Sequence, residues 1–266
     1  MKTIGKRIQC PRNGIMAVRV VAVTLVVIVA SGCALTHTEP ICPPGQQASI
    51  VLVALTSQPS IESVRESAAS ISHQVARRAA SDCAVLSTGV ADANPSSDMA
   101  LNSISLLPTA KSAPDRTPWI SELQARAERW LNRYFIGPLR HASPSSNSPV
   151  LNTLASVASQ EKAAGRHAGT VVEVTDAVAV ETAPDGALVD LSQPTDAELA
   201  AHQQSFVPGL TALKGGCVLI VDAGAGSGLG LQHLERARRS IDEALDAKDI
   251  GLAWTRSQEV PEHCRE

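Results

Sequence analysis

Aromatic side chains and metal-binding motifs are scarce in this 266-residue sequence. Only three Trp, two Phe and one Tyr are present, which is 2% of the residues. No Cys-x-x-Cys pair occurs, and the seven histidines form no metal-ligand spacing with one another. A structural zinc site needs such closely spaced ligands, so the sequence argues against one.

A long membrane-spanning apolar run is also missing. The apolar residues 20–30, with apolar character continuing to Leu35, fall short of the roughly 20 residues that a spanning helix needs. Five basic residues precede the run, and Ala30-Ser31-Gly32-Cys33 closes it. A basic start, a short apolar stretch and small residues before a cysteine resemble a bacterial lipoprotein signal.

The signal predicts how the chain is organised. We expect residues 1–32 to be a signal peptide that is removed, and Cys33 to carry lipid such as palmitate. Residues 33–48 would be a tether and residues 49–266 one domain, held on the extracytoplasmic side of the cell membrane. An uncleaved transmembrane anchor is the less favoured alternative, and Met16 is a second candidate start.

Basic residues are few once the signal peptide is gone. Its removal takes away five basic and no acidic residues, so the counts of 23 and 26 become 18 and 26. An acidic domain of about −8 formal charge without a basic stripe would repel phosphate backbones. Nucleic acid is therefore not expected as a partner, and membrane contact is assigned to the lipid.

Four cysteines remain in the predicted mature chain besides Cys33. They are Cys42, Cys83, Cys217 and Cys264. In an oxidising compartment, four such thiols are expected to form two disulfides. Pairing of 42 with 83 and of 217 with 264 is preferred, but all three connectivities stay open.

The order of apolar patterns predicts a doubly wound α/β fold. Unalternating apolar runs indicate strands buried on both faces, and amphipathic helices are expected between them. The link 92–98 is too short for a helical crossover, so the strands on either side should be an antiparallel pair. The sheet is thus expected to be mostly parallel, with one antiparallel edge hairpin strand and helices on both faces. Strands are expected at 50–54, 83–90, 99–107, 170–175, 217–221 and 252–254.

Residues 119–135 hold four of the six aromatics, at helical spacing. Trp119, Trp130, Tyr134 and Phe135 are interpreted as core packing rather than as a stacking surface. The segment 137–149, with three prolines and four serines, is expected to be a surface loop.

A glycine-rich segment at 222–229 is the most enzyme-like part of the chain. It resembles methyltransferase motif I, but only 38 residues follow Gly228. The frames from Gly224 and Gly226 lack the third glycine of a dinucleotide fingerprint, and Ser227 lacks the outer glycines of a nucleophile elbow. We interpret the segment as a tight strand-to-helix loop.

Several segments in order are similar to von Willebrand factor type A domains, in a form seen in actinobacterial envelope proteins. The segments that show this resemblance are strand 50–54 with Leu55-Thr56-Ser57, the hairpin strands, and segments 171–176, 188–192 and 224–229. The resemblance covers nearly all of residues 49–256. It implies a three-layer α/β sandwich with a ligand crevice at the carboxyl ends of the strands.

Family members with a working metal site hold Mg²⁺ through Asp-x-Ser-x-Ser, a later Thr and a distal Asp. Here Ala54 replaces the leading Asp, so a charged oxygen ligand is lost and Mg²⁺ binding is doubtful. The alternative is that Thr56 caps a helix and that Asp176 is solvated or bonded to amides. The remaining positions would be Thr56, Gln58, Ser146 or Ser148, and Asp176.

These observations favour a non-catalytic, metal-independent interaction domain that binds an envelope protein or another ligand. No nucleophile, general base or metal cluster stands out, so an enzyme is not expected. A solute-binding lipoprotein of a transporter and an envelope hydrolase with an unrecognised site remain as alternatives.

Overall fold

A computed structural model of the chain describes residues 48–56, 61–91, 99–107, 119–144, 149–176, 180–182, 188–190, 208–221 and 230–255. The chain divides into two units, Met1–Thr38 and Glu39–Glu266, and every described residue belongs to the second. None of the helices in these ranges is long and apolar enough to cross a membrane.

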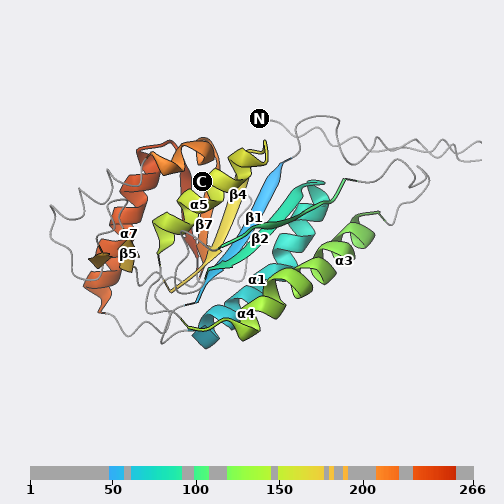
Figure 1. Ribbon diagram of the computed structural model, residues 1–266, viewed down its shortest axis with the longest axis horizontal. Helices are drawn as coiled ribbons and strands as arrows, with labels where there is room; N and C mark the ends of the chain where they lie inside the picture. The colour runs from blue at the N-terminus through green and yellow to red at the C-terminus, as the bar shows by residue number, and fades with distance from the viewer. Residues whose placement is uncertain are drawn as a thin grey trace, which may run out of the picture. The chain divides into compact units, whose positions relative to one another are not determined.

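The main sheet has six strands in the order β3-β2-β1-β4-β7-β8 (Figure 1). Neighbouring strands are parallel except β2 and β3, which are antiparallel. This confirms the predicted α/β class with one antiparallel edge strand. The strands are β1 (Ser49–Leu55), β2 (Val85–Ala91), β3 (Asn102–Ser105), β4 (Ala168–Val174), β7 (Cys217–Val221) and β8 (Gly251–Thr255). A separate antiparallel pair joins β5 (Val180–Thr182) to β6 (Leu188–Asp190).

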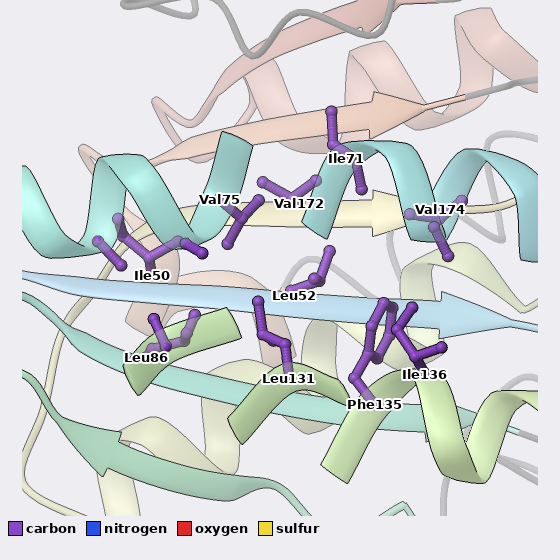
Figure 2. Close-up of a cluster of buried hydrophobic side chains, with 14 of the residues drawn as sticks. Ile50, Leu52, Ile71, Val75, Leu86, Leu131, Phe135, Ile136, Val172 and Val174 are labelled. Carbon is purple, nitrogen blue, oxygen red and sulfur yellow. The ribbon is translucent and has the colours of Figure 1, made fainter. Parts of the chain in front are cut away.

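Strand β1 divides the core into two layers because its side chains alternate between two buried faces. Ile50, Leu52 and Ala54 join the core under α1 (Ile61–Ser81) and α3 (Trp119–Leu131) (Figure 2). Val51, Val53 and Leu55 join the core under α5 (Val150–Ala163), η2 (Gly209–Leu213) and α7 (Leu231–Asp246). The unalternating sequence of β1 thus follows from burial on both faces.

A π-helical turn, η1 (Asn132–Ile136), connects α3 to α4 (Gly137–His141). From α3 to α4 a buried residue occurs at every fourth position. In an ordinary α-helix each such step turns the buried side by about 40° around the helix axis. The wider turn, with Gly137 N–H bonded to the carbonyl of Asn132, offsets this rotation. It keeps Phe135 in the core beside Leu131 (Figure 2). The residues of the repeat are Leu123, Ala127, Leu131, Phe135 and Leu139.

Two expectations for this region need correction. The predicted surface loop 137–149 begins with helix α4, which follows η1 directly and has Pro138 in its first turn. The core interpretation is correct for Phe135, and the half-buried Trp130 packs against the same core, whereas Tyr134 is half-buried. The side chain of Trp119 and the glycine-rich segment 222–229 lie outside the described residues.

Cys83 and Cys217 both lie at the edge of the sheet where the parallel strands begin. Each is disulfide-bonded. Strands β1 and β4 separate β2 from β7, which places the two cysteines about 14 Å apart across the sheet. A disulfide joins Cα atoms less than about 7 Å apart, so these two are not bonded to each other. Cys33, Cys42 and Cys264 lie outside the described residues.

Peptide mapping under non-reducing conditions can decide between the two connectivities that this separation leaves for the four cysteines. We expect Cys42 linked to Cys83 and Cys217 linked to Cys264, because Cys42 precedes the strand adjacent to Cys83 in the sheet. A peptide that links Cys42 to Cys217 would contradict the preferred pairing. A peptide that links Cys83 to Cys217 would contradict the strand order itself.

Candidate functional site

The chain order reverses between β1 and β4, where ligands bind in doubly wound folds. Thr56 follows β1 and Asp176 follows β4. Because Ala54 pairs with Val174 across the two strands, Thr56 and Asp176 come equally far beyond this pair. Both residues are fully buried, with 0% exposure. The structure therefore brings two of the predicted site residues to one edge and closes both from solvent, while Ser146, Ser148 and Gln58 lie outside the described residues.

Thr56 connects three segments at this edge. Its N–H donates to the carbonyl oxygen of Ala91 at the end of β2, at 3.2 Å. Its hydroxyl lies 3.2 Å from the same oxygen and 3.1 Å from the carbonyl oxygen of Ser143, after α4, and its one proton serves these two acceptors. The Thr56 hydroxyl thus joins β1 to β2 and to the segment after α4. Whether it also caps a helix stays a prediction, because residues 57–60 lie outside the described residues.

Arg65 on α1 fixes the segment that presents the Ser143 carbonyl. Its Nε donates to Leu139 O at 3.2 Å, and its Nη2 donates to Arg140 O at 3.0 Å and to Ala142 O at 3.4 Å. Carbonyls at a helix end lack partners within the helix, and a guanidinium satisfies them and complements the helix dipole. The sequence carries no signal for this role, because Arg65 lies more than 70 residues before these carbonyls.

The described residues at this edge offer few of the oxygen ligands that a Mg²⁺ ion needs. Mg²⁺ requires near-octahedral oxygen ligands, including carboxylates, and usually keeps several waters. Ala54 supplies no carboxylate, and the Thr56 hydroxyl is already engaged with backbone carbonyls. Asp176 is fully buried and interacts with the rest of the chain. Within the described ranges no group of three or more His, Cys, Asp or Glu could hold a metal.

A second polar centre, which the sequence reasoning missed, surrounds Glu161 on α5. Arg166 donates to both oxygens of this carboxylate, from Nε at 2.8 Å and from Nη2 at 2.7 Å. Ser49 Oγ and Ser87 Oγ donate to it at 2.7 Å and 2.9 Å. Arg166 also reaches Ser103 Oγ on β3 at 3.1 Å. We call Ser49, Ser87, Ser103, Glu161 and Arg166 the Glu161 cluster.

The Glu161 cluster stabilises the sheet rather than forming a reactive centre. Burial opposes ionisation of Glu161, but the hydrogen bonds from Arg166, Ser49 and Ser87 outweigh burial and lower its pKa. A carboxylate with a lowered pKa is a weak base, so it would not activate the serines as nucleophiles. The neighbouring Gln160 donates to Met99 O at 2.7 Å and accepts from Leu101 N–H at 2.9 Å. Helix α5 thereby holds the segment leading into edge strand β3.

Thr56→Val tests the closure at the carboxyl edge. Valine keeps the branched shape but removes the hydroxyl donor, so we expect the free energy of unfolding to fall by about 1–2 kcal/mol in urea denaturation. Thr56→Ser keeps the donor and is the matched control. Wild-type stability in Thr56→Val together with a loss in Thr56→Ser would show that the methyl group, rather than the hydrogen bond, matters.

Glu161→Gln tests the cluster through pH. Because the folded-state pKa of Glu161 is lowered, its stabilisation is present above the unfolded-state pKa and is lost as pH falls through the folded-state pKa. We expect the variant to lose about 2–3 kcal/mol of stability near neutral pH, since Arg166 is partly exposed, and to depend less on pH in the acid range. Glu66→Gln, at an exposed position on α1, should keep the wild-type pH dependence. An unchanged acid dependence in Glu161→Gln would contradict this role.

Comparisons with known proteins give structural likeness only. No family model and no curated protein sequence matches the chain. Two crystal structures of the pilus adhesin SpaC from Lactobacillus rhamnosus GG are similar over 81% of this chain, at 13% and 14% identity and TM-scores of 0.41 and 0.43. The human COPII-coat protein Sec24c is similar over 79%, at 12% identity and a TM-score of 0.38.

The matched regions are 28%, 29% and 30% of those chains, so this chain spans less than a third of each. The fold follows from the strand order itself, independently of these matches. A six-stranded, mostly parallel sheet with one antiparallel strand and flanking helices fits a von Willebrand factor A-like domain.

Proposed function

We propose that this chain is a lipid-anchored, non-catalytic interaction domain of a bacterial cell envelope, which binds an envelope protein or another ligand without a metal ion. The closed carboxyl edge of the sheet carries the proposal. There Thr56 is bonded to backbone carbonyls, Asp176 is fully buried, and Ala54 stands where metal-binding relatives would need an acid. A partner would therefore bind to outer surfaces of the domain.

The anchor is proposed from the sequence around Cys33. Basic residues, a short apolar run and Ala30-Ser31-Gly32-Cys33 form the order of a lipoprotein signal. The described domain begins at residue 48, so about 15 residues separate its first strand from the proposed lipid.

The chemistry of the described residues supports binding over catalysis. The Glu161 carboxylate is neutralised by Arg166, and the Thr56 hydroxyl has no adjacent base among its bonded partners. A solute-binding role would need a cleft between two lobes, whereas the described strands build one main sheet whose two faces are covered by helices.

Cross-linking in intact bacteria tests the proposal as a whole. The full chain should incorporate a palmitate analogue, fractionate with membranes and give the same cross-linked partner with and without a chelator. Cys33→Ala should lose the label and leave the membrane fraction, because the attachment atom is gone. Cys10→Ala, within the predicted signal peptide, is the matched control and should behave as wild type.

Each outcome bears on a separate part of the proposal. Label retained in Cys33→Ala would contradict the lipid anchor. A partner lost in chelator would contradict metal independence, and failure to capture any reproducible partner would contradict the interaction role.

A further inference from the structure

The outer face of α3 and η1 carries a stripe of cationic and aromatic side chains. Arg126, Arg129, Trp130, Arg133 and Tyr134 follow one another at i, i+3, i+4, i+7 and i+8, which places them on one side of the helix. The three arginines are exposed, and the two aromatics are half-buried. We call these five residues the arginine stripe. It belongs to the helix that runs beside α1 (Figure 1).

The cations of the stripe are available for an external anion. Arg126 and Arg129 have no carboxylate partner among the residues that the structure describes. The Arg133 guanidinium lies 5.2 Å from the centre of the Tyr134 ring, which in turn lies 5.4 Å from the Trp130 ring. The nearby carboxylate of Glu128 is engaged by His73 Nδ1 at 2.8 Å.

This local charge corrects the expectation that the mature chain has no basic stripe. From 119 to 141 the sequence holds four arginines and two glutamates. Helix α7, by contrast, has three arginines among four carboxylates. The overall negative charge thus conceals one surface of the opposite sign.

We propose that the arginine stripe docks on the anionic phospholipid headgroups of the membrane to which the chain is tethered, which rests on the proposed lipid anchor at Cys33. A guanidinium presents a planar fork that binds phosphate oxygens in pairs. Trp and Tyr side chains favour the headgroup level of a bilayer. The stripe lies on the convex outer side of a helix, so it suits a flat array of phosphates better than one enclosed ligand.

Charge and tether length also favour this occupant. A domain of about −8 formal charge is repelled by an anionic surface everywhere except where arginines gather, so the stripe would set the orientation of the domain. Only residues 34–48 separate the proposed lipid at Cys33 from the first strand, so the anchor would hold the domain next to the membrane surface.

Vesicle co-sedimentation of residues 39–266, the compact unit that contains both cores, tests the proposal without the lipid anchor. We expect binding to phosphatidylglycerol–phosphatidylcholine vesicles, weakened by salt, and none to phosphatidylcholine alone. Each arginine at an anionic surface contributes about fivefold in partitioning, so R126Q/R129Q/R133Q should reduce binding about 100-fold. The matched control R77Q/R236Q/R239Q removes the same charge from exposed positions on α1 and α7 and should bind nearly as wild type. Thermal unfolding should show that both triple variants are folded.

Three results would overturn the proposal. They are equal losses in both triple variants, binding to phosphatidylcholine alone at the same strength, and no binding to anionic vesicles. Stripe-dependent binding to heparin or duplex DNA, but not to vesicles, would assign the surface to an anionic polymer instead. Because the vesicle assay needs no lipidation, its result is separate from the palmitate labelling of Cys33.

Discussion

Burial of β1 on both faces is the constraint on which the rest of the structure depends. Each side chain from Ile50 to Leu55 has 2% exposure or less, so neither face of the strand reaches water. Its backbone groups must then be satisfied within the sheet, by β2 on one side and β4 on the other. Two helical layers are needed to cover the two faces, and these layers determine where every other element lies.

The same burial determines how the polar side chains next to the sheet find their partners. At the carboxyl edge, a hydroxyl removed from water has to find protein partners, and Thr56 finds them in the carbonyls of Ala91 and Ser143. On the helix α5 side, Glu161 is 1% exposed and remains ionised because Arg166 and two serines bind its oxygens. Both polar centres are thereby engaged in holding the fold together. This is why we look for partners on the outer helical faces.

Much of this architecture could be predicted from local patterns. Apolar runs identified the buried strands of the main sheet, and the short link 92–98 identified the antiparallel pair, whose edge strand β3 is mostly exposed. The errors arose where a distant contact overrides the local pattern. Pro138 and the serines suggested a loop, but the π-turn keeps Phe135 in the core and lets α4 continue from α3. The carbonyls bonded to the Thr56 hydroxyl lie 35 and 87 residues away, and the serines bonded to Glu161 lie 74 and 112 residues away, beyond the reach of periodicity.

The sequence by itself determined the class of fold, the proposed lipid attachment at Cys33 and the absence of an acid at position 54. Motifs and periodicity can be read from neighbouring residues without knowledge of the fold. Only the tertiary structure decided that Thr56 and Asp176 are closed from solvent and that Cys83 and Cys217 lie too far apart to bond to each other. It also showed three exposed arginines gathered with Trp130 and Tyr134 on one helix face. Burial and charge clustering depend on which distant segments lie together in the fold. The composition of the chain does not contain that information, because it counts residues without regard to where they lie.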